Sequence, residues 1–321
     1  MKEPLLEITD LDLRVAGSEQ TGGPNLVEGV NLRVDEASIT AVVGESGSGK
    51  TLTALASIGL LPPAIEMVHG SIRLAGQDCE QQTQKAWRSM RGRVVSMVFQ
   101  EPMTALDPVF TVGELMLETL SLDGVSRRDA REQALALLEE VRVPEPVRCM
   151  SSVPHQLSGG MRQRVVIALA LARNPRLLLA DEPTTALDAI TQEAVMDLFD
   201  QLRSSRGLGI LLITHDLSLV AHRVQQLVVL HGGRMCEAGA SDLVMRNPRH
   251  PYTRGLLACR LPVVSREEPL KQMAAVLDDP ASWEVVQSQE GPVKPWWPSL
   301  VGANPSSPRL VSVDTDHFLA V

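Results

Sequence analysis

The feature that most constrains the fold of this chain is the octapeptide GESGSGKT at residues 44–51. It follows the apolar run 39–43 and precedes a helix-like segment at 52–60. The pattern G-x-x-x-x-G-K-T between a strand and a helix predicts a loop whose backbone N–H groups surround phosphate oxygens. Glycines permit that close approach, and a helix start favours anions. We therefore expect a nucleoside triphosphate to be bound by Gly44, Glu45, Ser46, Gly47, Ser48, Gly49, Lys50 and Thr51.

Two residues of this loop have separate expected tasks. Lys50 would reach the β- and γ-phosphates, and the Thr51 hydroxyl would bind Mg²⁺. The loop predicts a nucleoside triphosphate as ligand, but it does not indicate what the energy is used for.

Apolar runs alternate along the chain with segments of helical periodicity, which predicts an α/β fold with a mostly parallel sheet covered by helices. Buried strands are expected at 39–43, 94–99, 177–180 and 210–214, and helices at 52–60, 159–173 and 191–202. Residues 6–15 and 30–34 alternate apolar and polar side chains, which predicts antiparallel strands with Leu11, Leu13 and Val15 on one face. We also expect a short strand at 70–76 and a hairpin of 227–230 with 235–237.

A helical insert is expected within this α/β domain, because residues 101–157 change in character. Ser126 and Asp129 resemble a capping box at a helix start, and apolar residues follow at helical spacing. Pro144 and Pro146 are expected to end that helix. We interpret its leucine stripe as core packing.

Polar residues follow the ends of several expected strands, where ligands bind in open α/β sheets. They are Gly44, Gln100, Asp181 and His215. Asp181 would hold Mg²⁺, and Glu182 would orient and polarise the attacking water. Gln100 would reach both Mg²⁺ and that water. His215 would hydrogen-bond the γ-phosphate, although a single histidine at this place is also consistent with a structural role.

A second glycine-rich helix start occurs at residues 157–163, LSGGMRQ. Its backbone N–H groups and the Ser158 hydroxyl would suit another γ-phosphate. One nucleotide rarely needs two such helix starts from one chain. The simplest arrangement is two chains head to tail, each offering this turn to the nucleotide of the other.

With these motifs the chain resembles the ATP-binding subunit of ABC transporters over about residues 5–260. The matching parts are the Walker A loop 44–51, the Q-loop Gln100, the signature 157–163, the Walker B segment 177–182, the D-loop 186–188 and the switch His215. The resemblance implies a P-loop NTPase cassette with an antiparallel β subdomain, and a dimer that closes on ATP and Mg²⁺ and hydrolyses ATP. It also implies nucleotide contacts from Leu157, Ser158, Gly159, Gly160, Gln163 and Asp188.

Two further segments resemble the branch that imports dipeptides, oligopeptides and nickel: residues 99–113, and residues 247–257 with the HPY sequence. This implies an importer of di- or oligopeptides, with nickel or a metal chelate (metallophore) as the alternative cargo. The implied partners are a second, different ATP-binding subunit, two permeases and an extracytoplasmic binding protein. The expected location is the cytoplasmic face of the bacterial inner membrane. A soluble ABC ATPase of DNA repair or ribosomes is disfavoured, since the chain has no long coiled-coil insert and no second cassette. A degenerate cassette that only binds nucleotide is disfavoured by Glu182, His215 and the intact Ser-Gly-Gly.

Composition limits the other partners. Thirty basic against 39 acidic residues give a net charge of −9, which argues against nucleic acid as the main ligand. The longest apolar run we find, 165–172, is far shorter than the ~20 residues of a membrane helix.

The N-terminus lacks the apolar region of a signal peptide. Cysteines at 79, 149, 236 and 259 form no CxxC pair, so we expect reduced thiols.

The chain departs from the family in two places. The usual adenine-stacking aromatic is missing at Val15, and residues 16–26 contain none. Only Cys259 follows the HPY segment, so no iron–sulfur cluster is expected.

We expect an ATP-binding domain at 1–240 with its helical subdomain at about 101–160, an HPY segment at 241–265 and a Pro/Trp tail at 266–321. Trp296 and Trp297 indicate either a docking segment or a tail that folds back on its own domain, and we favour the latter.

Overall fold

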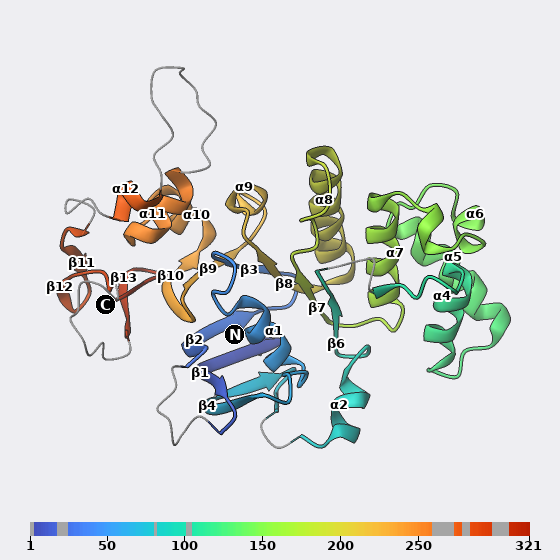
Figure 1. Ribbon diagram of the computed structural model, residues 1–321, viewed down its shortest axis with the longest axis horizontal. Helices are drawn as coiled ribbons and strands as arrows, with labels where there is room; N and C mark the ends of the chain where they lie inside the picture. Colours follow the sequence, from blue (N-terminus) through green and yellow to red (C-terminus); the bar gives the residue numbers. More distant parts are fainter. Residues whose placement is uncertain are drawn as a thin grey trace. The chain divides into compact units, whose positions relative to one another are not determined.

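The computed structural model describes residues 3–17, 25–79, 82–100, 105–258, 273–277, 283–296 and 308–321. The chain divides into two units built from interleaved segments (Figure 1). The first unit comprises Met1–Leu5, Asp35–Ser38 and Gln81–Ile213. The second comprises Leu6–Val34, Ile39–Glu80 and Thr214–Val321. Helices and mostly parallel strands alternate, as the sequence predicts.

Parallel strands form the centre of the first unit. They are β6 (Val95–Val98), β7 (Leu177–Asp181) and β8 (Gly209–Thr214), with β7 paired to both neighbours. All five residues of β7 are buried, as expected of a parallel strand covered on both faces. The unit also contains α2 (Gln84–Met90), α7 (Gly159–Leu171) and α8 (Ala189–Arg206). Helix α8 is longer at both ends than the sequence indicates, and α7 ends two residues before the expected Arg173.

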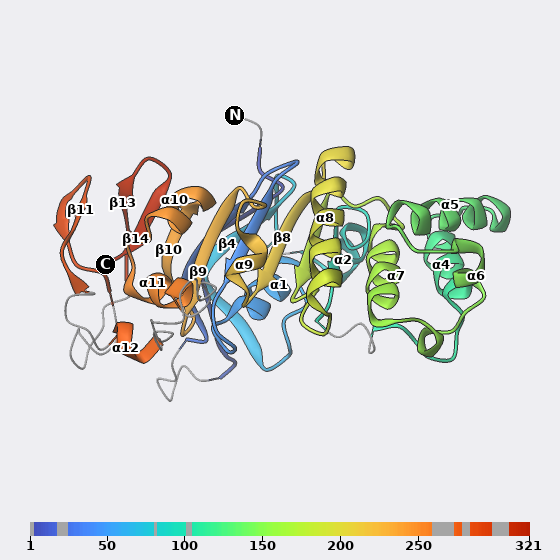
Figure 2. The same ribbon diagram turned by 90° about the horizontal axis from the view of Figure 1, so that it is seen from above.

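The expected helical insert lies in the first unit as α4 (Val112–Ser121), α5 (Arg127–Glu140), α6 (Pro146–Met150) and the short 3-10 helix η2 (Pro154–Gln156). Figure 2 shows the three α-helices grouped together. Ser126 caps α5 by accepting the Asp129 N–H, as predicted, and Thr111 and Glu114 form a full capping box on α4. The expectation for Pro146 is wrong: it begins α6, because a proline at the first helical position has no N–H to leave unsatisfied.

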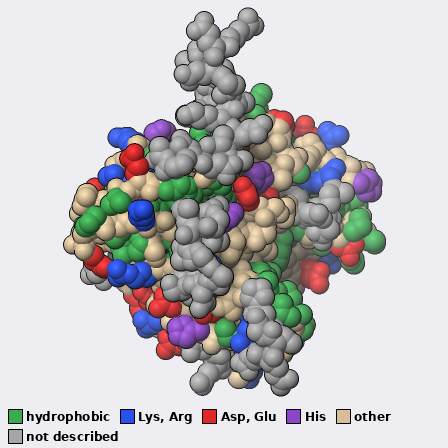
Figure 3. All heavy atoms as spheres, turned by 60° about the vertical axis from the view of Figure 1, so that its left-hand side comes forward, with side chains coloured by type: hydrophobic (Ala, Val, Ile, Leu, Met, Phe, Trp, Pro, Cys, Tyr) green, Lys and Arg blue, Asp and Glu red, His purple; other side chains and the backbone are tan. Residues whose placement is uncertain are grey.

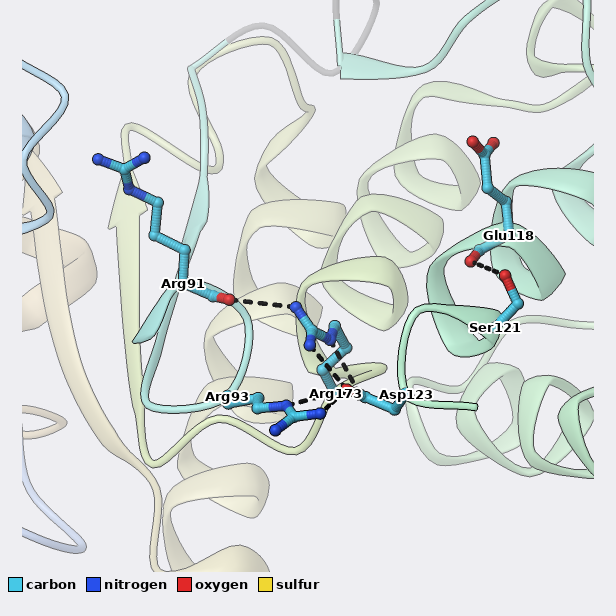
Figure 4. Close-up of polar contacts among 6 residues, drawn as sticks. All are labelled: Arg91, Arg93, Glu118, Ser121, Asp123 and Arg173. Carbon is cyan, nitrogen blue, oxygen red and sulfur yellow. Dashed lines mark hydrogen bonds and ion pairs between the residues drawn. The ribbon is translucent and has the colours of Figure 1, made fainter. Parts of the chain in front are cut away.

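Two arginines and one aspartate connect the end of α4 to the parallel strands of this unit (Figure 4). Asp123 accepts from Arg173 Nε at 2.9 Å and Arg173 Nη2 at 2.7 Å, and also from Arg93 Nε at 2.9 Å. Arg173 follows α7 and Arg93 precedes β6. The two guanidiniums, Arg173 foremost, hold the pKa of Asp123 well below its usual range. This cluster therefore fixes the helical insert to the core of the first unit.

Antiparallel strands open the second unit. They are β1 (Leu6–Val15), β2 (Val27–Val34), β4 (Ile65–Leu74) and β5 (Gln77–Asp78), and β1 pairs with both β2 and β4. Strand β4 starts five residues before the expected 70, because β1 pairs with it along its full length. Val15 is 46% exposed whereas Leu11 and Leu13 are buried, and it is the last residue of β1. The register shifts along β1 lie before Leu13, and Leu13–Val15 pair with β4 without interruption, so Leu13 and Val15 share one face of the strand, as predicted.

The remaining strands of the second unit are arranged around β10 (Arg234–Ala240). β9 (Gln226–His231) pairs with it in the expected hairpin, and β3 (Ile39–Val43) lies parallel to β9. The other edge of β10 meets β2 at Arg234 and β14 (His317–Ala320) at Glu237–Gly239. Helix α1 (Lys50–Ser57) follows β3, beginning two residues before and ending three before the expected segment. The later elements are α9 (Leu217–Val220), α10 (Ser241–Arg246), α11 (Pro251–Ala258), α12 (Met273–Leu277), β11 (Val286–Ser288), β12 (Gly291–Val293) and β13 (Leu310–Asp314).

The described part of the tail folds back on the second unit, as predicted. β14 pairs with β10, and Trp296 is 5% exposed with its backbone N–H on Ala320 O at 2.9 Å. Figure 3 shows charged side chains of both signs interspersed over the face where these C-terminal elements lie. Trp297 and Cys259 lie outside the described residues, so the expectations attached to them stay predictions. Cys79, Cys149 and Cys236 are buried free thiols. Within the described ranges, no helix has both the length and the apolar character to cross a membrane.

The arginine–aspartate cluster predicts a pH-dependent contribution to stability. Asp123→Asn should lower the free energy of unfolding by about 1 kcal/mol at pH 7, because a partly exposed network of charge-assisted hydrogen bonds is lost. The folded pKa of Asp123 lies below its unfolded value of about 3.9, so the difference from wild type should persist above that pH and shrink as the pH falls below it. Urea unfolding at several pH values measures this. Glu118→Gln, on the exposed side of α4, is the control; a pH-independent Asp123→Asn effect would contradict the assignment.

Candidate nucleotide site

The phosphate loop begins where β3 ends and closes at the first residue of α1. A Cβ on Gly44 would lie 2.1 Å from Leu230 O and 2.7 Å from Ser48 Oγ, so only glycine fits there. Gly49 precedes α1 in the left-handed region with φ +94°, and no side chain caps the helix. Residues 44–49 therefore turn sharply against β9 and leave the helix start open, as an anion site requires.

The Lys50 ammonium lies inside this loop. Its Nζ is 2.8 Å from Gly44 O, 2.7 Å from Glu45 O and 3.3 Å from Ser48 Oγ, and the residue is 5% exposed. Carbonyl oxygens partly compensate the cost of burying the charge. The lysine thus holds the two peptide carbonyls at the start of the loop.

The turn between β9 and β10 supports the loop from behind. Gly233 N–H donates to Ser48 O at 3.2 Å, and Gly233 O accepts from Glu28 N–H at 2.8 Å. A Cβ on Gly233 would lie 2.4 Å from Leu26 O. The sequence indicated this hairpin but not its contact with the loop, which joins residues far apart in the chain.

A tyrosine from the HPY segment also reaches the loop. The Tyr252 hydroxyl accepts the Glu45 N–H at 3.1 Å, and its ring lies against His231 with centroids 4.5 Å apart. Sequence reasoning missed this residue, since nothing local at position 252 indicates a partner 207 residues away.

The two predicted carboxylates stand at the end of β7, in the first unit. Asp181 is 2% exposed. Glu182 follows it, and its Oε2 accepts from Gln100 Nε2 at 3.2 Å and from Thr185 Oγ1 at 2.9 Å. The structure therefore brings Gln100 and Glu182 together, and it adds Thr185, which the sequence analysis did not select.

Glu182 has an unusual backbone conformation. Its φ is +45°, in the left-handed region, which costs an L-residue with a side chain roughly 1–2 kcal/mol. The Glu182 N–H donates to Ile213 O at 2.9 Å, so pairing with β8 holds the strained residue. Such strain is concentrated at functional sites, where the surrounding structure fixes it.

The second glycine-rich turn is also in the first unit. Ser158 caps α7 by accepting the Met161 N–H at 3.3 Å. A Cβ on Gly160 would lie 2.6 Å from Thr191 Cγ2 at the start of α8. Asp188 caps α8 by accepting the Thr191 N–H at 3.0 Å and its hydroxyl at 2.8 Å, and these bonds lower the pKa of Asp188. The turn and the segment before α8 are thus one packed element.

Exposure differs among the residues selected in this turn. Ser158 and Gly159 are exposed and Gly160 is partly so, whereas Leu157 and Gln163 are buried. Among the described residues, the Gln163 amide has no hydrogen-bond partner. The exposed members are the ones that another molecule reaches without rearrangement.

His215 lies just after β8 and is exposed, in the second unit with the phosphate loop. Asp216 donates its N–H to Thr214 Oγ1 at 3.0 Å and caps α9. The chain therefore carries a phosphate loop, a strained glutamate with a glutamine beside it, and a second exposed glycine-rich helix start. These features define an ATP-binding cassette.

Comparison with known proteins agrees with this class. Residues 27–185 match the family described as ABC transporter. The chain is 44% identical over 263 residues to a Brucella melitensis ATP-binding protein whose name assigns it to peptide import, covering 80% of this chain and 77% of that protein. It is 42% identical over 256 residues to the oligopeptide transport ATP-binding protein OppD of Bacillus subtilis, covering 79% and 71%. The dimeric ATP-binding cassette MJ0796, bound to ADP and Pi, matches with a TM-score of 0.64 at 28% identity, over 74% of this chain and 98% of that one.

The chain therefore belongs to the ATP-binding proteins of the ABC transporter family. It binds ATP and is an ATPase, as members of this family are.

The fit of Gly44 under Leu230 O gives a direct test of the loop. Gly44→Ala should destabilise the chain by roughly 3 kcal/mol, the upper end for overpacking, because its Cβ meets backbone that has no room to move. Gly47→Ala is the matched control: it also has a positive φ, +79°, but nothing lies within 4 Å of its Cβ. Its cost should be about 1–2 kcal/mol, from the backbone alone. Thermal unfolding without nucleotide measures both, and equal midpoints for the two variants would contradict the description.

Proposed function

We propose that this chain is the ATP-binding and ATP-hydrolysing subunit of an importer for di- or oligopeptides. The observation that carries the cargo class is the extent of the similarity to peptide import and oligopeptide transport proteins. Those matches span 256 to 263 residues and so extend past residues 27–185, the part that matches the ABC transporter family. The HPY sequence at 250–252 supports the same branch.

The residues of the phosphate loop have proposed roles toward the nucleotide. The backbone N–H groups of Gly44, Glu45, Ser46, Gly47, Ser48 and Gly49 line the phosphate cradle. Lys50 keeps its bonds to the Gly44 and Glu45 carbonyls and turns from Ser48 Oγ, a longer contact at 3.3 Å, toward the β- and γ-phosphates. The exposed His215 hydrogen-bonds the γ-phosphate.

Magnesium fits the oxygen donors that the chain offers. A Thr51 hydroxyl, a Gln100 amide oxygen and a buried Asp181 carboxylate are hard ligands, and Mg²⁺ prefers one or two such groups with phosphates and water over a cage made only of protein. When bound, Mg²⁺ neutralises phosphate charge.

Glu182 is the proposed base that orients the attacking water. Its Oε2 already receives two donors, from Gln100 and Thr185, so its position is fixed before substrate arrives. The Gln100 amide beside the Glu182 carboxylate can hydrogen-bond the ligand without adding a charge. Turnover would therefore require the carboxylate, while nucleotide binding would not.

The second glycine-rich turn is proposed to act on the nucleotide of a partner chain. The exposure of Ser158 and Gly159, and the open helix start behind them, support this. The turn is supported by Leu157 and Gln163, which are buried beneath it, and by Gly160 and Asp188, which both contact Thr191. The solved relative MJ0796 is described as dimeric.

The proposed assembly pairs this chain with a second ATP-binding subunit, two permeases and an extracytoplasmic binding protein, at the cytoplasmic face of the membrane. In it, residues 1–240 form the ATP-binding domain with the helical subdomain at about 101–160, 241–265 the HPY segment and 266–321 the tail. The cargo test is to co-purify the complex and identify the ligand that its binding protein retains. A retained peptide supports the proposal, whereas nickel or a metal chelate would replace it.

The role of Glu182 predicts a separation of binding from hydrolysis. Glu182→Gln should bind ATP with wild-type affinity, because the amide preserves size and hydrogen bonding, yet lose 10²-fold or more of turnover as the general base is gone. Nucleotide titration and phosphate release on the assembled complex measure the two quantities. Glu193→Gln, on α8, is the control. Wild-type turnover by Glu182→Gln would refute the role.

Shared catalysis predicts that the isolated chain is a poor ATPase. Its activity per chain should rise with protein concentration, or on adding the partner ATP-binding subunit, because the partner supplies half of each site. Steady-state ATP hydrolysis over a hundredfold range of chain concentration measures this. Full turnover that stays constant across the range would exclude a site built from two chains.

A further inference from the structure

We infer that Tyr252 is a positioning residue for ATP binding: its buried hydroxyl holds the first peptide of the phosphate loop in the binding conformation. The inference rests on the proposed role of that loop and adds a residue of the HPY segment to it. It also gives the C-terminal tail a task, since the tail holds the element that carries the tyrosine.

The contact is made by a side chain with no freedom to leave. Tyr252 is 0% exposed, and its hydroxyl accepts the Glu45 N–H at 3.1 Å. Its ring packs against the ring of His231, the last residue of β9, with an interplanar angle of 54°. Position 252 carries the only tyrosine of the sequence, so the contact has its own spectroscopic label.

One rigid peptide unit is held at both of its polar ends. The peptide that joins Gly44 to Glu45 donates its N–H to Tyr252 and offers its carbonyl oxygen to Lys50 Nζ at 2.8 Å. A peptide is planar, so fixing both ends fixes its orientation. Gly44, which must be glycine to pass under Leu230 O, otherwise allows this plane to rotate. Tyr252 removes the freedom that the glycine introduces.

His250 positions Tyr252. Its Nδ1 accepts the Tyr252 N–H at 3.1 Å, and its Nε2 lies 2.9 Å from Trp296 O. A carbonyl only accepts, so Nε2 carries the proton and Nδ1 the lone pair. Burial lowers the pKa of His250 to about 4, which keeps this neutral form at pH 7. Both ring nitrogens are thereby used to join the tyrosine to the tail.

The tail completes the support through His317, which contacts Glu237 of β10. This buried carboxylate accepts the N–H of Arg249 at 2.6 Å and of His250 at 3.0 Å, and it contacts His317 Nε2 at 2.7 Å. Trp296 in turn donates its backbone N–H to Ala320 O. Residues of β10, of β14 and of the segment just before α11 therefore hold one another in place next to Tyr252, which contacts the loop.

The expected consequence concerns nucleotide affinity more than the rate of chemistry. Preorganising the loop removes an ordering cost from binding, and the hydrogen bond is made to the phosphate loop and not to Glu182, the proposed base. Tyr252→Phe removes only the hydroxyl and keeps the buried ring. It should raise the Kd for ADP and the KM for ATP about 3- to 10-fold, the worth of one hydrogen bond, and leave kcat within about twofold.

The test compares Tyr252→Phe with Thr253→Val in the assembled complex. Thr253 is the next residue, is 0% exposed, and its hydroxyl has no hydrogen-bond partner among the described residues. Its loss should leave Kd and KM unchanged. A second measurement needs no substitution: a chain with labelled tyrosine gives one NMR signal, which should shift when ADP binds.

The outcomes separate this inference from the proposed site. Lys50→Ala should abolish nucleotide binding. If it does so while Tyr252→Phe leaves Kd and KM at wild-type values, the tyrosine has no positioning role and the loop assignment stands. If Lys50→Ala binds ADP normally, the loop assignment itself fails. A kcat that collapses in Tyr252→Phe at constant Kd would also overturn the inference.

Discussion

The close passage of Gly44 beneath the Leu230 carbonyl is the constraint on which the nucleotide site depends. It forces a glycine after β3, which gives the loop its turn and also its freedom to move. The rest of the second unit limits that freedom: Lys50 binds the loop carbonyls, Gly233 supports Ser48, and Tyr252 holds Glu45. The geometry of the loop is thus a property of the whole unit, including its C-terminal hairpin.

The first unit prepares the chemistry in a different way. The phosphate loop relies on a flexible glycine, Gly44, that is held by contacts. The first unit relies on Glu182, whose backbone is strained and which follows the fully buried strand β7. Pairing with β8 fixes the backbone of Glu182, and Gln100 and Thr185 fix its carboxylate. The arginines on Asp123 then tie the helical insert to the same strands. Each unit therefore preorganises one part of the reaction with its own contacts.

Local patterns allowed much of this to be predicted. The strand–loop–helix at residues 39–57, the Ser158 cap and the tail folding back follow from glycine spacing, capping chemistry and composition. Pro146 was misassigned because a proline both ends and begins helices. Tyr252 was missed since its partner lies 207 residues away, and only the folded sheet brings β10 and α11 behind the loop.

The account centres on a reaction divided between two chains, and amide hydrogen exchange tests it most directly. The measurement follows residues 157–163 in the assembled importer in three states: without nucleotide, with ADP, and with a non-hydrolysable ATP analogue. If the exposed Ser158 turn closes on the γ-phosphate of a partner, these amides should become protected when the analogue binds and stay open with ADP. Exchange that is the same in all three states would place the turn in solvent throughout and contradict a shared site.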